Sequence, residues 1–206
     1  MDKYTKLKIA TRYRLLGMSQ VDPRWLNALS AFDFAEQYHT GTRKDGKTPE
    51  FMHQLQIISF LLPHIRFMND PVGVIVAAFL HDTREDYDID SEKIERLFGE
   101  RASIDIECLT KKFRNIKKNA EEYYTPLASN YNSSLVKGAD RINNLSTMIG
   151  AFSKEKQIAY CAETRVWFFS FLKEARRNFP SQEPIYESIK FALEIQLNIY
   201  EEMNKE

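Results

Sequence analysis

Residues 70–86 read DPVGVIVAAFLHDTRED, and this stretch decides how the rest of the chain is interpreted. Asp70 can cap a helix and Pro71 fits a first helical turn, so a helix is predicted to begin here. The residues from Val72 to Leu80 are apolar on nearly every side, which is typical of a helix at the centre of a fold. A buried strand is the alternative for a valine-rich run, but the sequence offers no second convincing strand to pair with it.

Helices are also expected elsewhere, because apolar residues recur at intervals of three and four and neither repeats nor low-complexity tracts interrupt them. Tyr123–Ser134 is expected to be a connecting loop. The sequence therefore predicts an all-α fold, with one helical domain over residues 21–206 and an amphipathic helical extension over residues 1–20. The helices expected in that domain, besides the central one, are Asp22 to Gly41, Thr48 to Pro63, Asp90 to Gly99, Ile104 to Asn119, Leu135 to Met148, and two C-terminal helices, Lys154 to Asn178 and Pro184 to Met203.

Composition limits the classes of function that fit this chain. Lys plus Arg and Asp plus Glu each total 29, so the formal charge cancels and no overall basic field would attract a nucleic acid polymer. Two cysteines without metal-binding spacing read as free thiols of a reducing cytosol. No apolar run approaches the roughly 20 residues that cross a bilayer, and the charged N-terminus does not resemble a signal peptide. We expect a cytoplasmic protein that binds no membrane.

His81, Asp82, Glu85 and Asp86 form an electrostatically unusual end to the central helix. Carboxylates at a helix C-terminus are disfavoured by about 0.3 to 1 kcal/mol each. The three carboxylates, Asp82, Glu85 and Asp86, share one face of the helix by their spacing. A divalent cation would relieve their repulsion. Imidazole with carboxylate suits Mn²⁺, Fe²⁺ or Zn²⁺ better than Ca²⁺ or Mg²⁺.

Other segments must complete such a metal site, because adjacent residues on a helix point about 100° apart. His53, in the first turns of its helix, is one candidate ligand. Asp140 is the other, because it shares a polar stripe with Asn144 and Thr147 on an otherwise apolar helix. The predicted metal ligands are therefore His53, His81, Asp82 and Asp140.

The remaining histidines, His39 and His64, do not belong to a comparable cluster of candidate ligands. Each is interpreted as an ordinary helix C-terminal or surface residue.

Motifs in a fixed order resemble the HD superfamily of phosphohydrolases, whose name describes the His-Asp pair found here at positions 81 and 82. The sequence is most similar to the alarmone hydrolase domain of RelA/SpoT proteins and of their small stand-alone relatives, which remove the 3′-pyrophosphate from ppGpp and pppGpp. The similarity covers about Ala31 to Met148. It is carried by Phe34-Ala35 to His39, Arg43-Lys44 and Gly46, Thr48-Pro49 leading to His53, Ala77 through Asp86, Leu97-Phe98-Gly99, Leu109-Thr110-Lys111, and Lys137 with Ala139-Asp140-Arg141 and Asn144.

The resemblance implies an HD-domain helical bundle whose four candidate ligands bind Mn²⁺, while Glu85 and Asp86 handle the attacking water. Such chemistry fits these residue types, because a bound ion lowers the pKa of water and a nearby carboxylate accepts its proton. No synthetase domain is expected after Met148, where the chain reads as two further helices. The residues implied to approach the small-molecule nucleotide substrate are Arg43, Lys44, Asn144 and Thr147.

The chain departs from the family at three positions. Glu50 replaces a tyrosine, Gln54 replaces a proline, and Asn143 stands where histidine or tyrosine is usual. None is a predicted ligand, but Glu50 adds negative charge where a phosphorylated ligand would enter. Two alternatives therefore stay open. One is hydrolysis of another nucleotide, as by a nucleotidase, a cyclic-nucleotide phosphodiesterase or an NADPH phosphatase. The other is a non-catalytic nucleotide-binding module, whose aromatic C-terminal helices offer a surface for a homo-oligomer.

Overall fold

The structure is a computed structural model that describes residues 1–204 of the chain. Within that range the backbone is helical apart from short connections and one small hairpin, so the all-α prediction is confirmed. The α-helices are α1 (Lys3–Val21), α2 (Trp25–Tyr38), α3 (Met52–Leu61), α4 (Pro71–Leu80), α5 (Thr83–Tyr87), α6 (Ser91–Phe98), α7 (Glu100–Leu109), α8 (Ala120–Ala128), α9 (Tyr131–Thr147), α10 (Lys154–Glu163), α11 (Phe169–Asn178) and α12 (Glu183–Met203). Shorter elements are η1 (Leu62–Phe67), η2 (Thr164–Phe168), η3 (Pro180–Gln182), β1 (Lys112–Phe113) and β2 (Ile116–Lys117).

Helix α4 is the central helix that the sequence predicts. Every residue from Val74 to Leu80 is buried, and the helix packs against α2, α3, α7 and α9. Its start is capped as expected, since the Asp70 carboxylate accepts a hydrogen bond from the Gly73 backbone N–H at 3.0 Å. A side chain at Gly73 would collide with Asp70 and Asn132, so this close approach needs glycine.

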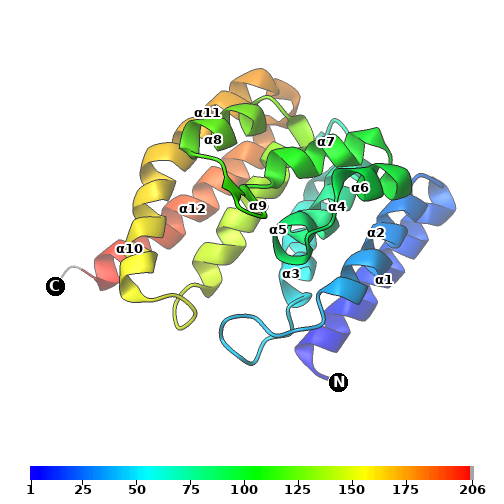
Figure 1. Ribbon diagram of the computed structural model, residues 1–206, viewed down its shortest axis with the longest axis horizontal. Coiled ribbons are helices and arrows are strands. Elements are labelled where there is room, and N and C mark those ends of the chain that lie inside the picture. The colour runs from blue at the N-terminus through cyan, green and yellow to red at the C-terminus, as the bar shows by residue number, and fades with distance from the viewer. Residues whose placement is uncertain (205–206) are drawn as a thin grey trace.

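Helix α9 separates two groups of helices. Figure 1 shows α1 to α6 on one side of α9, and α8, α10, α11 and α12 on the other. Helix α9 packs so closely on α12 that a Cβ at Gly138 would lie 2.5 Å from Ile189 Cδ1. Every candidate ligand-bearing segment therefore borders this one helix: α3 and α4 contact it directly, and α5 follows α4.

Helix α1 packs on α2 and α3, with Leu15 fully buried and Thr11 nearly so. The division of the chain into this extension and a domain from residue 21 stays a prediction. Among the described residues, no helix is long and apolar enough to cross a membrane. Cys108 and Cys161 are free thiols, as expected.

Two expectations between Ile104 and Ser134 are wrong. The helix expected to reach Asn119 ends at Leu109, and an antiparallel hairpin, β1 with β2, follows it. The expected loop Tyr123–Ser134 is instead occupied by most of α8 and by the start of α9. Helix α8 begins with a capping box in which Asn119 and Glu122 each accept the other's backbone N–H. Pro126 lies inside α8, where it reads from sequence as a helix breaker.

Candidate active site

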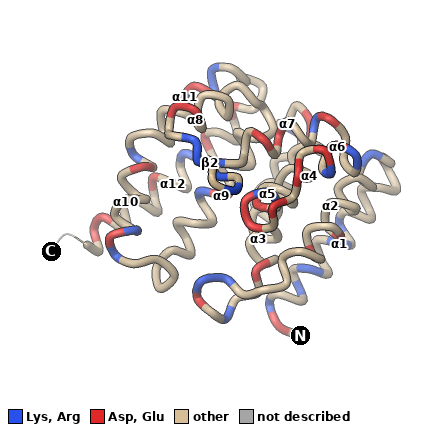
Figure 2. Tube along the Cα trace, in the orientation of Figure 1, with Lys and Arg blue, Asp and Glu red and all other residues tan. Residues whose placement is uncertain are grey.

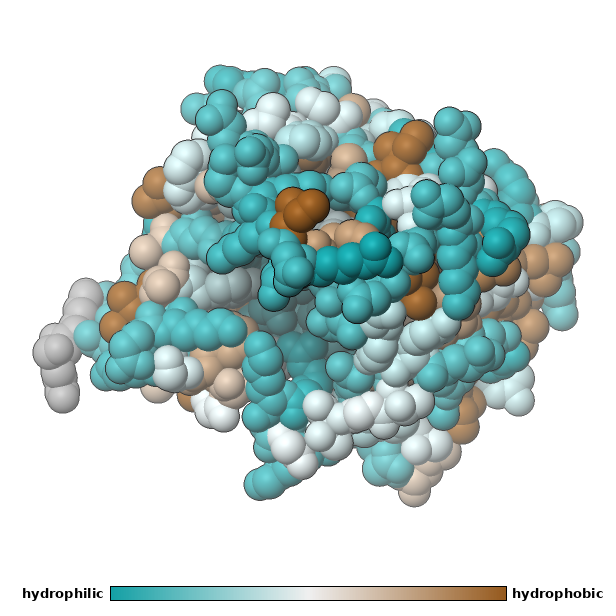
Figure 3. Space-filling model, in the orientation of Figure 1, coloured by the Kyte–Doolittle hydropathy of each residue, from teal (hydrophilic) through white to brown (hydrophobic). Residues whose placement is uncertain are grey.

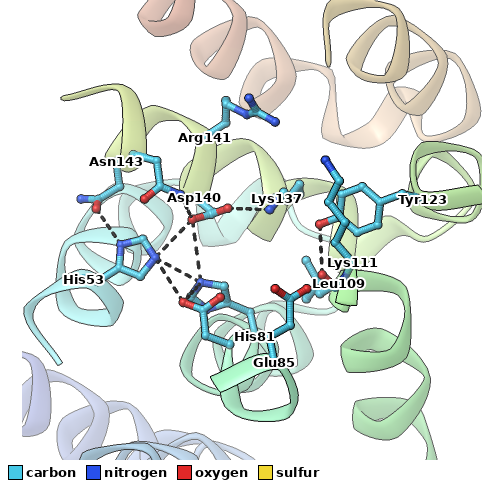
Figure 4. Close-up of polar contacts among 12 residues, drawn as sticks. His53, His81, Glu85, Leu109, Lys111, Tyr123, Lys137, Asp140, Arg141 and Asn143 are labelled. Atoms are coloured by element: carbon cyan, nitrogen blue, oxygen red, sulfur yellow. Dashed lines mark hydrogen bonds and ion pairs between the residues drawn. The ribbon is translucent and has the colours of Figure 1, made fainter. Parts of the chain in front are cut away.

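Four side chains from distant parts of the chain converge beside α9. His53 comes from α3, His81 from the end of α4, and Asp140 from the middle of α9 (Figure 4). Asp82 follows His81 in the break between α4 and α5. The two Nε2 atoms of the histidines lie 3.2 Å apart. From His53 Nε2 it is 3.2 Å to Asp140 Oδ1 and 3.5 Å to Asp82 Oδ2, and from His81 Nε2 it is 3.0 Å to Asp82 Oδ2. The structure thus brings all four predicted metal ligands together.

The second nitrogen of each imidazole is already engaged. His53 Nδ1 lies 2.7 Å from Asn143 Oδ1, and His81 Nδ1 lies 2.9 Å from the Ala78 carbonyl oxygen. Both partners are acceptors, so each Nδ1 carries a proton and each Nε2 faces the carboxylates, where it offers a lone pair when the ring is neutral. Two imidazole Nε2 atoms and two carboxylates therefore face a common point. This donor set fits a divalent first-row cation.

The local charges show how strongly this point attracts positive charge. Burial opposes a charge on His81, but the Asp82 and Asp140 carboxylates outweigh it and raise the pKa of His81 to about 9. Burial likewise works against ionisation of Asp140, yet the Lys137 ammonium, 2.7 Å away, and His53 hold the pKa of Asp140 well below its usual range. A divalent cation would compete with protons for these same lone pairs.

Glu85 and Asp86 belong to a separate short helix, α5, and not to the end of the central helix. The expectation that they crowd a helix C-terminus is wrong, because α4 ends at Leu80 and both acids lie in the first turn of α5. The Glu85 carboxylate accepts hydrogen bonds from the backbone N–H groups of Lys111 and Lys112, at the start of the hairpin. The helix terminus therefore does not add to the repulsion among these acids.

Asp86 is a weaker acid than an ordinary aspartic acid. Burial, together with the nearby Asp82 and Glu50 carboxylates, raises the pKa of Asp86 to about 6. The group therefore exchanges its proton close to neutral pH.

A cavity of about 790 Å³ is lined by three of the four candidate ligands, His53, Asp82 and Asp140, and its walls carry opposite charges. Figure 2 shows acidic residues along α5, with basic residues close by near β2 and on the loop that follows α2. The face of the molecule seen in Figure 3 is largely hydrophilic and is hollowed near its centre. All the residues predicted to approach a nucleotide line this cavity, namely Arg43, Lys44, Asn144 and Thr147.

Two of these residues are already held in place. Arg43 Nη2 donates to Asn144 Oδ1 at 3.1 Å, which ties the basic loop to α9. Asn144 Nδ2 in turn donates to Asp140 Oδ1 at 2.6 Å, so this polar stripe is continuous with the candidate metal ligands. Lys44 Nζ lies 5.5 Å from the centre of the Phe152 ring.

Sequence reasoning missed several residues that line this cavity. Lys137 belongs to one of the motifs that carry the resemblance, and its position one helical turn before Asp140 is the spacing of an ion pair. Phe152, Lys156 and Tyr160 lie beyond the motif region, and their approach to the cavity depends on the tertiary packing of α10.

The interpretation of His39 as an ordinary C-terminal or surface residue needs correction. It does end α2, but only 3% of it is exposed, and both ring nitrogens have partners, Gln54 and Tyr87. His64 is half-buried in η1, where its Nδ1 lies 2.9 Å from the Phe60 carbonyl oxygen.

Curated proteins are similar to this chain in sequence. The chain is 34% identical over 143 residues to a probable guanosine-3′,5′-bis(diphosphate) 3′-pyrophosphohydrolase of Synechocystis, a match over 66% of this chain and 18% of that protein. It is 31% identical over 139 residues to a guanosine-3′,5′-bis(diphosphate) 3′-pyrophosphohydrolase of Aquifex aeolicus, over 65% of this chain and 19% of that protein. The chain therefore spans only about a fifth of the length of these curated relatives.

A solved structure shares the fold. It is that of a metazoan ortholog of SpoT, described as hydrolysing ppGpp, and it aligns with a TM-score of 0.61 and 24% identity over 79% of this chain and 93% of that one. The sequence model of the HD domain matches residues 31–171, which extends past the last predicted motif into α11. Since this match includes every residue that converges beside α9, the chain belongs to the HD domain family.

Proposed function

We propose that this chain is a metal-dependent phosphohydrolase that removes the 3′-pyrophosphate of (p)ppGpp. The observation that carries the proposal is the convergence of two imidazole nitrogens and two carboxylates at the floor of a cavity with one acidic and one basic wall. The names of the relatives from Synechocystis and Aquifex aeolicus support this choice of substrate.

The proposed metal ligands are His53, His81, Asp82 and Asp140, and the proposed ion is Mn²⁺, with other divalent first-row metals as alternatives. When bound, the ion would lower the pKa of a water molecule and offset charge that develops on phosphorus. Asn143 and the Ala78 carbonyl would orient the two imidazoles through their Nδ1 protons.

Glu85 and Asp86 are proposed to receive the proton of the attacking water. The two backbone N–H groups that donate to Glu85 fix its carboxylate at the cavity wall. Asp86 has a pKa raised to about 6 by burial and by Asp82 and Glu50, which suits a group that accepts a proton near neutral pH.

The basic wall is proposed to bind the phosphates. Arg43 and Lys44 offer charged donors to phosphate oxygens, and Arg43 also offers a flat face to a base. Asn144 and Thr147 are proposed to contact the nucleotide from α9, since both line the same cavity. Such a ligand is a small nucleotide and not a nucleic acid polymer, and a cytoplasmic location is proposed with it.

A screen of nucleotides on metal-loaded protein tests the proposal. Phosphate and pyrophosphate release would be followed with Mn²⁺, Co²⁺ and Zn²⁺, and we expect Mn²⁺-dependent release of pyrophosphate from ppGpp. Asp82→Ala and His53→Ala should abolish metal binding and turnover together.

Other outcomes of the screen select the alternatives. Preference for a substrate without a 3′-pyrophosphate would replace ppGpp by another nucleotide. Metal-loaded protein that binds nucleotides but turns none of them over would indicate a binding module. Either result would contradict the proposed reaction.

A further inference from the structure

Four side chains beside the cavity form a continuous hydrogen-bond chain that none of the predicted roles includes. Gln54 Nε2 lies 3.0 Å from His39 Nε2, and His39 Nδ1 lies 3.1 Å from the Tyr87 hydroxyl oxygen. The same hydroxyl donates to Glu50 Oε2 at 2.6 Å. Gln54 and His39 are only 1% and 3% exposed, whereas Glu50 lines the cavity, so the chain runs from the core to the site.

The hydrogen-bonding capacities of these groups fix the direction of the chain. A side-chain amide nitrogen only donates, so His39 Nε2 accepts from Gln54 and the ring proton lies on Nδ1. That proton is donated to Tyr87, whose own proton is then free for Glu50. A reversed Gln54 amide would take the Nε2 proton instead and leave the single Tyr87 proton shared between two acceptors. Burial, only partly offset by Asp82, lowers the pKa of His39 to about 4, which agrees with a neutral ring.

The hydrogen-bond chain joins two parts of the site, helix α5 and the basic loop. Tyr87 ends α5, a helix of five residues, which is too short to be stable without tertiary contacts. Within the described residues, the Asp86 side chain has no hydrogen bond of its own. Its position therefore depends on the neighbouring side chains of α5: Arg84 is held by Ser91 and Glu107, Glu85 is tied to the hairpin, and Tyr87 bonds Glu50.

Glu50 stands at the stem of the basic loop. Its backbone N–H donates to the Gly41 carbonyl at 2.9 Å, and the Thr42–Pro49 bridge lies next to it. The loop carrying Arg43 and the helix carrying Asp86 are therefore linked through one carboxylate and one hydroxyl.

We propose that the chain Gln54–His39–Tyr87–Glu50 positions the acidic helix α5 against the basic loop, and that Tyr87 and Glu50 are positioning residues for hydrolysis. This inference rests on the proposed function, because it assigns these residues a role in the same reaction. It also gives Glu50 a use that differs from simple repulsion of a phosphorylated ligand, since the hydrogen bond to Tyr87 holds that carboxylate against α5.

The tautomer of His39 tests the chain without any substrate. The protein has only four histidines, so the ring nitrogens can be assigned by two-dimensional ¹⁵N NMR with single His→Gln variants. We expect a neutral His39 ring with its proton on Nδ1, and a change of that signal in Tyr87→Phe. A proton on Nε2, or a His39 signal that does not respond to Tyr87→Phe, would overturn the proposal.

Kinetic measurements on variants then distinguish a positioning role of Tyr87 and Glu50 from simple repulsion of a phosphorylated ligand by Glu50. Tyr87→Phe should lower kcat about 10-fold with little change in KM, which is the usual size of such supporting contacts. Glu50→Gln keeps an oxygen that accepts the Tyr87 proton and should retain nearly the native kcat, whereas Glu50→Ala should behave like Tyr87→Phe. If Glu50 acted by repulsion alone, Glu50→Gln and Glu50→Ala would both lower KM and leave kcat unchanged, which would overturn the proposal.

Tyr186→Phe is the matched control, because it removes a buried hydroxyl, bonded to Ser134 and Gln182, away from the cavity. It should lower thermal stability and leave kcat unchanged, and an equal kcat loss in both Tyr→Phe variants would show a merely structural effect and reject the proposal. If ppGpp is not turned over, the same ratios are measured on whichever nucleotide is. The tautomer of His39 is measured without substrate and therefore holds in either case. A wrong substrate can thus be distinguished from a wrong assignment of the hydrogen-bond chain.

Discussion

Asn143→Ala is expected to weaken metal binding through His53, although Asn143 is not itself a candidate ligand. Asn143 Oδ1 accepts the Nδ1 proton of His53 at 2.7 Å, and its amide nitrogen donates to Gln56 Oε1 at 2.9 Å, which fixes the amide. Without this acceptor the His53 proton would move to Nε2, where Asp140 Oδ1 lies 3.2 Å away. The ring would then donate to a carboxylate from the atom that should bind the ion.

The size of the effect follows from the hydrogen bond that metal binding would have to break. A hydrogen bond to a charged group contributes about 1.5 to 3 kcal/mol, which corresponds to roughly a tenfold to a hundredfold loss of affinity. This range agrees with the roughly 10- to 100-fold effect of removing a partner that orients a metal-bound histidine.

Calorimetric titration of Mn²⁺ into chelator-treated protein measures this loss directly. Asn143→Asp is the control, because it keeps an oxygen acceptor for His53 and should bind nearly as tightly as the native protein. Native affinity in Asn143→Ala, with a folded protein, would refute the idea that Asn143 selects the tautomer of His53.

Three further predictions follow from the site. Glu85→Gln should bind Mn²⁺ with native affinity but slow turnover roughly 100- to 10,000-fold, the range for a lost general base, and a normal rate would reject that role. The pKa of Asp86 is raised to about 6 from an ordinary 3.8, so folding favours the protonated form, and the folded state loses stability as pH rises between these values. Asp86→Asn should therefore stabilise chelator-treated protein above pH 6 but not below pH 4. Thermal melting measured across this pH range checks the prediction. Arg141→Met should lower the free energy of unfolding by about 3 kcal/mol in denaturant titrations and leave metal affinity unchanged. The reason is that the buried Arg141 side chain bonds Thr164, Tyr124 and Glu163. In the variant, Glu163 would still have its ion pair with Lys111.

The central helix could be predicted because its signals are local. Asp70, Pro71 and an unbroken apolar run specify α4 without reference to the rest of the chain. The hairpin could not be predicted in the same way, because the Lys111 and Lys112 N–H groups are satisfied by Glu85, 26 and 27 residues away in sequence. Helix α8 is a different kind of error, since Asn119 and Glu122 form a capping signal that can be read from the sequence.

The convergence of the candidate ligands could be anticipated only from residue types and from the resemblance. A polar stripe on α9 indicates that Asp140 faces a cavity or a ligand, but spacing alone cannot say that His53 lies opposite it. The role of His39 was out of reach for a similar reason. Its partners Gln54 and Tyr87 are 15 and 48 residues away, and only the packed fold shows that they enclose it.

The region after Met148 is part of the site and not an appendage to it. Asp140 and Arg141 are neighbours on α9 whose side chains point apart, the first toward the candidate ligands and the second toward the C-terminal helices (Figure 4). Arg141 is fully desolvated there, so its ion pair with Glu163 and its hydrogen bond to Thr164 hold the end of α10 against α9. Lys156, on that helix, lines the cavity. A single turn of α9 therefore fixes both the floor of the site and one of its basic walls.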